Sequence, residues 1–135
     1  MITGLNHITL AVSDVERSLA FYTQRLGFTG HVKWDKGAYL SVGDLWLCLS
    51  LDTPCPKDDY THLAFSVAPD AFVALVASLT DPSNCPVTVW KQNKSEGQSL
   101  YLLDPDGHKL EIHVGCLQSR LHALKTAPYQ GLVWL

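Results

Sequence analysis

The sequence predicts an α+β fold built from two βαβββ modules. In each half of the chain, one β-like segment precedes a helix-like segment, and further β-like segments follow it. The two halves also align with each other in the same order, as copies of one module do. With 135 residues, 47% of them hydrophobic, the chain can bury one sizeable core. We therefore expect one domain, with module 1 at about 1–52, module 2 at about 58–115, and a C-terminal helix and tail at about 116–135.

The first half begins with "LNHITLAV", whose β-branched residues predict a strand over 5–12. A helix is expected over 13–28, with Ser13 or Asp14 as its N-cap and Gly27 at its end. The strands expected next lie within "GHVKWDKGAYLSV" (30–42), which turns at 35–37, and "LWLCLSL" (45–51).

The second half repeats this order after the proline-containing hinge "CPKDDY". "YTHLAFSV" (60–67) predicts a strand, and 69–80 predicts a helix with Pro69 in its first turn. The remaining elements expected are strands at 86–92, 99–104 and 108–114, and a terminal helix at 117–125.

The alignment of the halves pairs His7 with His62, and Cys48 with Glu111. The interval between the two paired positions is eight residues longer in the second half. We place the extra residues in "WKQNKSEGQS" (90–99), a polar stretch between two strands. Such a loop is expected to do more than connect strands.

Composition excludes several classes of partner. The net charge of −3 and the scattered basic residues give no electrostatic footprint for nucleic acid or for an anionic membrane. No apolar run approaches a membrane span, and the first residues lack the profile of a secretory signal, so we expect a cytoplasmic protein. The four cysteines lie far apart without a CxxC pair, and reduced thiols are expected.

Two imidazoles and one carboxylate suit a divalent first-row metal and leave coordination positions open. Joining two modules across a pseudo-twofold axis would bring His7 and His62 together with Glu111. His113, on the same strand face as Glu111, is the rival ligand. Hydrogen-bonded core histidines and a solvent-facing Glu111 are the alternatives. The other histidines are expected to be solvated, namely His108 in a turn, and His31 and His122 on the surface.

With these motifs in place, the chain resembles the vicinal-oxygen-chelate superfamily and, within it, the FosA-type fosfomycin-resistance glutathione transferases. The resemblance spans nearly the full chain. The segments that carry it are "GLNHITLAV", "WDKGAYL", "LWLCLS", "YTHLAF", "WKQNKSEGQSLYLLDPDGHKLEIHVG", "SRL" and "APY".

The resemblance implies a domain-swapped homodimer of paired βαβββ modules. In it, His7 of one chain joins His62 and Glu111 of the other around Mn(II). It also implies glutathione as co-substrate, fosfomycin as substrate and a K⁺ ion. Cys48 stands where relatives with four metal ligands carry a carboxylate.

The resemblance further assigns site residues. Those expected at the phosphonate are Lys91, Ser95, Ser99, Tyr101 and Arg120, with Thr9 near the epoxide oxygen and Trp46 and Cys48 lining the substrate site. Tyr39 is expected to hydrogen-bond the glutathione sulfur, and the glutathione channel is expected to include Trp34, Lys36, Ser50 and Lys94. The expected K⁺ loop offers Asn93, Ser95, Gly97 and Ser99, with Glu96 as countercharge.

Three rival functions stay open at this point. An enzyme of the same fold could use another thiol, or it could use water and open the epoxide by hydrolysis. A dioxygenase or a glyoxalase shares the fold but would not need the phosphonate-binding set. A metal-free protein that sequesters its drug is the rival from a different class.

Overall fold

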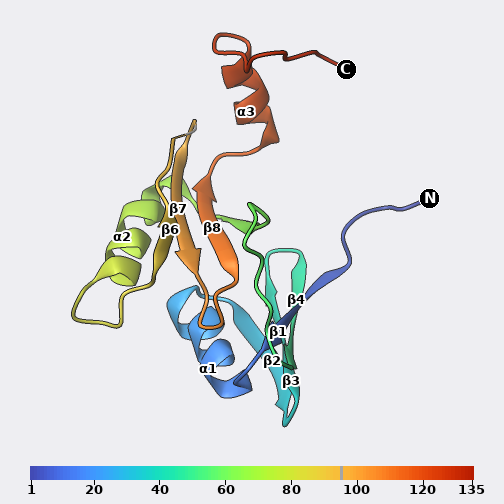
Figure 1. Ribbon diagram of the computed structural model, residues 1–135, viewed down its shortest axis with the longest axis vertical. Coiled ribbons are helices and arrows are strands. Elements are labelled where there is room, and N and C mark those ends of the chain that lie inside the picture. Colours follow the sequence, from blue (N-terminus) through green and yellow to red (C-terminus); the bar gives the residue numbers. More distant parts are fainter. Residues whose placement is uncertain (95) are drawn as a thin grey trace. The chain divides into compact units, whose positions relative to one another are not determined.

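Each half of the chain forms a four-stranded mixed sheet, in the order β1-β4-β3-β2 and β5-β8-β7-β6 (Figure 1). The computed structural model describes residues 1–94 and 96–135. These residues form two compact units. Unit 1 comprises Met1–Thr61 and Leu103–Lys109, and unit 2 comprises His62–Leu102 and Leu110–Leu135. Two sheets flanked by helices confirm the predicted α+β class.

Unit 1 follows the predicted βαβββ order. The β1 and β4 strands are parallel, and β3 pairs antiparallel with β4 and with β2. Its buried residues include Val12, Leu40, Leu47 and Leu49, which are at most 1% exposed. The elements are β1 (His7–Val12), α1 (Val15–Ala20), a π-helical turn η1 (Phe21–Arg25), β2 (Thr29–Trp34), β3 (Gly37–Val42) and β4 (Leu45–Leu51).

The helix of unit 1 differs from the single helix expected over 13–28. Asp14 is its N-cap, since the carboxylate accepts from the backbone N–H of Arg17 at 2.9 Å. The Ser13 hydroxyl instead donates to Asp106 at 2.5 Å. After α1 the helix continues as the wider π-helical turn η1. It ends before Gly27, whose φ of +78° suits glycine.

Unit 2 repeats the order, with β5 parallel to β8 and β6 antiparallel to β7. The predicted strand at 86–92 is wrong in length, because β6 covers only three residues. The backbone N–H of Val87 donates to the carbonyl of Leu79 at 2.9 Å, toward the end of α2 and away from the sheet ladder. The elements are β5 (Leu63–Ser66), α2 (Pro69–Thr80), β6 (Val89–Lys91), β7 (Gln98–Leu103), β8 (Lys109–Val114) and α3 (Leu117–Leu124).

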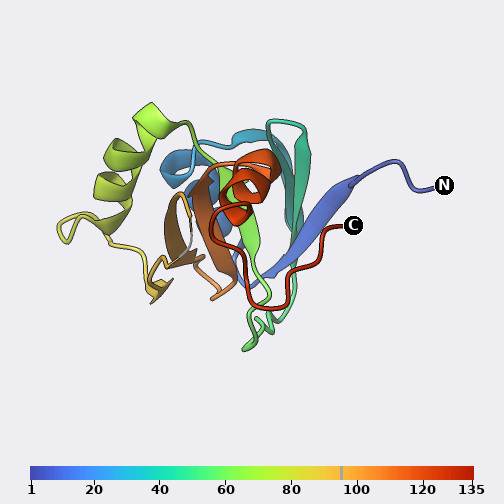
Figure 2. The same ribbon diagram turned by 90° about the horizontal axis from the view of Figure 1, so that it is seen from above.

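The two helices of unit 2 lie at different positions relative to its sheet. The ribbon of α2 runs alongside β6 and β7, and α3 continues beyond the carboxyl end of β8 (Figure 1). The last residues leave α3 as an extended tail, drawn in red in Figure 2. Pro69 occupies the start of α2, as predicted.

Strand register supports the internal repeat residue by residue. In unit 1, Thr9, two residues after His7, pairs with Cys48. In unit 2, Ala64, two residues after His62, pairs with Glu111. The alignment of Cys48 with Glu111 made from sequence therefore has the same pairing geometry in both units.

The 104–108 turn is part of unit 1, where it is tightly bonded. The Tyr22 hydroxyl donates to the buried Asp104 carboxylate at 2.8 Å, and Asp106 accepts from Arg17 at 3.0 Å. The expectation of a solvated His108 is wrong, because its Nε2 lies 2.7 Å from the Ala11 carbonyl oxygen. A ring N–H near a carbonyl is donated to it, and this contact ties the turn to β1.

Tyr22→Phe is expected to lower the free energy of unfolding by about 1–3 kcal/mol, because the buried Asp104 carboxylate loses a donor. Burial and the adjacent Asp104 charge raise the pKa of Tyr22 far above its usual value, so the phenol stays protonated and donates. Urea unfolding of the metal-free protein checks the loss. An unchanged free energy of unfolding would show that backbone donors alone satisfy Asp104.

All four cysteines are free thiols, as expected, and Cys48 is the buried one. Among residues 1–94 and 96–135, the helices are too short or too polar to cross a bilayer.

Candidate functional site

Unit 1 carries a row of rings across its sheet. His7 lies on β1 with its ring centroid 4.7 Å from that of Trp46, on β4. Tyr39 meets Trp46 edge to face at 5.2 Å, and Trp34 meets Tyr39 at 4.9 Å. Trp34, Tyr39 and Trp46 are 39–46% exposed, so they offer a wide aromatic surface to a ligand. Thr9, two residues after His7, is exposed on the same strand face.

The His7 ring is oriented as metal-binding histidines usually are. Its Nδ1 lies 2.7 Å from the Asn6 side-chain oxygen. An amide oxygen only accepts, so the proton sits on Nδ1 and the lone pair on Nε2. Ligand histidines commonly donate their second N–H to an oxygen in this way.

Unit 2 brings His62 and Glu111 together. Nε2 of His62 lies 3.0 Å from Oε2 of Glu111, and both side chains are largely buried. Two donors bound at right angles to one ion, each at roughly 2.1 Å, would be about 3 Å apart. One imidazole nitrogen and one carboxylate oxygen at this distance therefore fit a divalent cation.

The other Glu111 oxygen is held by Ser99. Oγ of Ser99 lies 2.6 Å from Oε1 of Glu111 and 2.8 Å from Nδ1 of His113. His113 Nδ1 is itself 3.4 Å from Oε1. Sequence reasoning proposed His113 only as a rival ligand and did not foresee this bonded group. The sequence signal for this group was the two-residue spacing of Glu111 and His113, which places both side chains on one face of β8.

Glu111 is ionised at neutral pH despite its burial. Burial alone would raise its pKa, but the hydrogen bonds from Ser99 and His62 and the charges of the nearby imidazoles outweigh that effect. The net result is a pKa below the usual value for glutamate. A carboxylate in this state can bind a cation without first losing a proton.

The lowered pKa predicts a pH dependence of stability. The stabilisation by Glu111 is present above its unfolded-state pKa of about 4.3, and it is lost as the pH falls through the lower folded-state pKa. We expect Glu111→Gln to reduce the loss of stability that occurs as the pH falls below about 5. Urea unfolding in EDTA at several pH values measures this. Parallel pH profiles for the two proteins would contradict it.

The aromatic pair of unit 1 recurs beside His62. Trp90 meets Tyr101 edge to face at 5.2 Å, and its indole N–H donates to the Leu110 carbonyl at 3.1 Å. Their centroids lie 5.6 and 6.0 Å from that of His62. Trp90 was missed from sequence; it lies at the register shift between Val89 and Lys91, where β2 of unit 1 carries His31.

The two cationic side chains predicted to bind the phosphonate lie in different parts of unit 2. Lys91 Nζ is 4.4 Å from the Tyr101 ring centroid, a cation–π contact. Arg120, on α3, donates from Nε to Glu96 at 3.0 Å and from Nη1 to the Tyr129 hydroxyl at 3.2 Å. Tyr129, in the tail, was not predicted.

The predicted K⁺ loop is partly described. The Asn93 side-chain amide donates to the Gly97 carbonyl at 2.9 Å. Gly97 has a φ of +82°. Lys94 is exposed, and Ser95, a predicted ligand of both phosphonate and K⁺, lies outside the described residues.

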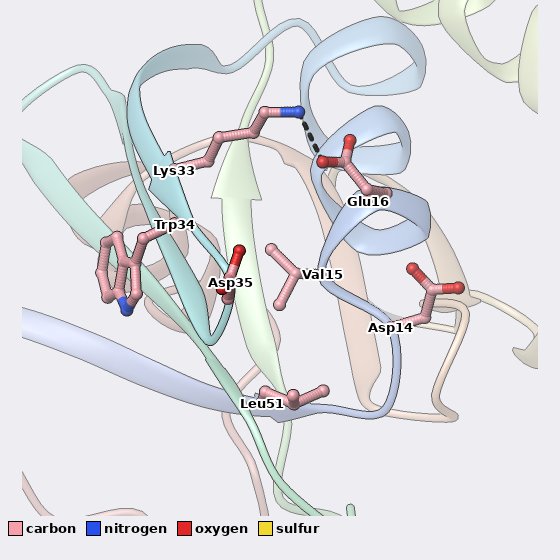
Figure 3. A pocket seen from close by; sticks show the side chains of 7 residues that line it. All are labelled: Asp14, Val15, Glu16, Lys33, Trp34, Asp35 and Leu51. Carbon is pink, nitrogen blue, oxygen red and sulfur yellow. Dashed lines mark hydrogen bonds and ion pairs between the residues drawn. The ribbon is translucent and has the colours of Figure 1, made fainter.

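One of the predicted glutathione residues, Trp34, lines a pocket of about 600 Å³ in unit 1 (Figure 3). Lys36 and Ser50 are exposed and adjoin lining residues in sequence, and Lys94 belongs to unit 2. Lys33 and Glu16 form an ion pair at the pocket. The other lining residues are Asp14, Val15, Asp35 and Leu51. No predicted metal ligand lines this pocket, so we do not assign the reaction to it.

Among residues 1–94 and 96–135, no group of three His, Cys, Asp or Glu side chains is arranged so that it could hold a metal ion within one chain. His62 and Glu111 belong to unit 2, and His7 belongs to unit 1.

The two βαβββ units, with Cys48 and Glu111 buried at the same register position, define the class: proteins of the vicinal-oxygen-chelate fold. The family model described as the Glyoxalase/Bleomycin resistance protein/Dioxygenase superfamily matches residues 4–112. A curated relative, glutathione transferase FosA of Serratia marcescens, is 52% identical over 99% of this chain and 96% of its own length. The chain therefore belongs to this superfamily and, within it, to the FosA-type fosfomycin-resistance family.

Other relatives agree with this membership. Metallothiol transferase FosB of Lysinibacillus sphaericus is 36% identical over 92% of this chain and 91% of its own length. Among solved structures, a mutant of the fosfomycin resistance protein FosX from Listeria monocytogenes, complexed with Mn(II) and 1S,2S-dihydroxypropylphosphonic acid, superposes with a TM-score of 0.77. It is 26% identical and covers 90% of this chain and 99% of the FosX chain.

Proposed function

We propose that this protein is a metal-dependent glutathione S-transferase that opens the epoxide of fosfomycin and so gives resistance to the drug. One observation carries the proposal. A chain 52% identical to a FosA glutathione transferase over nearly its whole length holds an imidazole and an ionised carboxylate 3.0 Å apart at the positions expected for metal ligands.

We propose Mn(II) as the metal, held by His7, His62 and Glu111. The Mn(II) in the FosX complex supports this choice, as does the nitrogen and oxygen donor set. When bound, a divalent ion of this kind acts as a Lewis acid at the substrate oxygens.

The chain supplies positive charge and hydroxyls for a phosphonate. Lys91 and Arg120 provide the charge, and Arg also offers a planar fork of donors. Ser95, Ser99 and Tyr101 complete the proposed set, with Thr9 at the epoxide oxygen and with Trp46 and Cys48 lining the site. Arg120 contacts Glu96 in this structure, so a bound phosphonate would compete with that carboxylate.

The reaction is a substitution at an epoxide carbon. The glutathione thiolate forms the carbon–sulfur bond, the carbon–oxygen bond breaks, and the released oxygen takes a proton to become a hydroxyl. A thiol of pKa about 8.5 is mostly protonated at pH 7, so the site must favour the thiolate. We assign this to the Tyr39 hydroxyl, with Trp34, Lys36, Ser50 and Lys94 along the glutathione channel.

We further propose K⁺ as an activating ion in the loop of Asn93, Ser95, Gly97 and Ser99, with Glu96 as countercharge. The hydrogen bond from the Asn93 side-chain amide to the Gly97 carbonyl supports the proposal, because it holds these two expected ligand residues near each other. A hard cation beside a dianionic substrate adds favourable charge. Removing K⁺ by exchange into a tetramethylammonium buffer should raise the KM for fosfomycin.

We propose that the working form is a domain-swapped homodimer, in which His7 of one chain meets His62 and Glu111 of the other. Large apolar side chains exposed near both ends of the chain support self-association. They include Ile2, Leu5, Leu117, Val133 and Trp134, which are 54–97% exposed. Light scattering coupled to size exclusion tests the oligomeric state.

The function is tested by incubating the purified protein with fosfomycin, glutathione, Mn(II) and K⁺. Mass spectrometry should detect the thioether adduct, whose mass is the sum of the two substrates. Absence of the adduct in this mixture, with a folded protein that binds Mn(II), would refute the glutathione transferase assignment.

A second function has specific support and belongs in the same experiment. The FosB relatives are named metallothiol transferases, and the FosX complex contains a dihydroxypropylphosphonic acid, the diol that water addition to the epoxide would give. Parallel reactions with cysteine, with bacillithiol and without thiol separate these routes. A hydrolase would need a carboxylate base near the epoxide, and β1 to β4 carry none.

A further inference from the structure

The imidazole of His113 lies in a slot between two glycines. A Cβ added at Gly97 would lie 2.6 Å from the Val114 carbonyl oxygen and 3.1 Å from Cε1 of His113. A Cβ added at Gly115 would lie 2.7 Å from Nε2 of His113. Both glycines have positive φ, +82° and +142°. The backbone therefore closes on the ring from two sides, and the slot fixes the direction of Nδ1.

The directions of the hydrogen bonds follow from the number of protons. The Glu111 carboxylate only accepts, so the Ser99 hydroxyl donates its single hydrogen to Oε1 at 2.6 Å. The remaining contact of Ser99 Oγ, with Nδ1 of His113 at 2.8 Å, must then be donated by the imidazole. Nδ1 of His113 thus carries a proton, and a directed chain of hydrogen bonds runs from His113 through Ser99 to Glu111.

We propose that His113 and Ser99 are positioning residues that hold Oε1 of Glu111 and thereby keep Oε2 turned toward His62. This inference rests on the metal-ligand role proposed for Glu111. It assigns His113 to orienting a ligand, in place of the metal-binding role that the sequence left open for it. Its Nδ1 is committed to Ser99, and its Nε2 faces Gly115.

This positioning role differs from general support of the fold, because it depends on a single hydrogen-bond donor at the position of Nδ1 of His113. Asparagine can present its amide N–H near the position of Nδ1. Glutamine carries the same amide one methylene farther out, near the position of Nε2. His113→Asn and His113→Gln are therefore matched variants, and His113→Leu removes the donor altogether.

The test measures Mn(II) affinity by the EPR signal of the free ion, and separately the kinetic dependence on Mn(II). We expect His113→Leu and His113→Gln to weaken Mn(II) binding by about 10–100-fold, and His113→Asn to bind within about threefold of wild type. Saturating Mn(II) should restore most of kcat in all three. The number of ¹⁴N couplings to bound Mn(II) should be unchanged in His113→Asn.

Wild-type affinity in His113→Leu would overturn the proposal. So would loss of a ¹⁴N coupling in His113→Asn, which would make His113 a ligand. If the His113 variants do not fold, as judged by circular dichroism, the pair Ser99→Ala and Ser99→Thr decides the same question. Only the alanine variant should weaken Mn(II) binding, and equal affinity of the two would refute the chain of donors.

Mn(II) binding and adduct formation together distinguish failure of the positioning role from failure of the proposed transferase function. A wild-type protein that binds Mn(II) with the expected variant pattern, but forms no fosfomycin adduct, would leave the positioning role standing and remove the transferase. A wild-type protein that binds no Mn(II) would overturn both.

Discussion

His62→Ala is expected to abolish both Mn(II) binding and fosfomycin consumption. The substitution removes one of the proposed nitrogen ligands and leaves the buried Glu111 carboxylate without its partner at 3.0 Å. We expect Mn(II) affinity to fall by more than about 100-fold, beyond the usual effect of residues that only orient a ligand. Isothermal titration with Mn(II) and an assay of remaining fosfomycin measure the two losses.

His122→Ala is the matched control. His122 lies exposed on α3, so its removal should change neither quantity. The two substitutions also separate an enzyme from a protein that sequesters the drug. If His62→Ala protects cells from fosfomycin as well as wild type does, metal-free sequestration is the better account.

Arg120→Ala is expected to lower kcat/KM for fosfomycin by about 100-fold while leaving Mn(II) affinity unchanged. A charge-assisted hydrogen bond contributes about 1.5–3 kcal/mol, which corresponds to roughly 10–150-fold. The loss should appear mainly in KM, because Arg120 is proposed to bind the phosphonate and is not a metal ligand. Steady-state kinetics at saturating Mn(II) and glutathione provide the measurement.

Arg120→Lys tests whether charge alone suffices. Lysine keeps the charge but loses the planar fork, which donates to both Glu96 and Tyr129 in this structure. We expect an intermediate kcat/KM. Unchanged kinetics in the alanine variant would remove Arg120 from the phosphonate site.

Much of the fold could be predicted because the repeat constrains both halves at once. The alignment of His7 with His62 brought Cys48 into line with Glu111, and the strand pairings at Thr9 and Ala64 carry the same geometry. The element boundaries were less accurate. The widening of α1 into η1 and the shortening of the strand at 86–92 depend on local hydrogen bonds, such as that of Val87 to Leu79.

The candidate site could be predicted by residue type but not by bonding. His62 and Glu111 lie 3.0 Å apart, as the sequence led us to expect, and their role as metal ligands stays a prediction. The contact of Ser99 with Glu111 and His113 depends on how β7 lies against β8, which periodicity alone does not give. His108 was assigned to solvent because a turn usually exposes its residues, yet its ring bonds to Ala11.

The hydrogen-bonded turn at 104–108 makes the two repeat copies depend on each other for stability. Unit 1 contains Leu103–Lys109, although the sequence repeat assigns those residues to the second copy. A fragment ending at the hinge would leave Ser13, Arg17 and Tyr22 without the acceptors that Asp104 and Asp106 provide. The first repeat copy of this chain is therefore incomplete without residues that lie far along in the second copy.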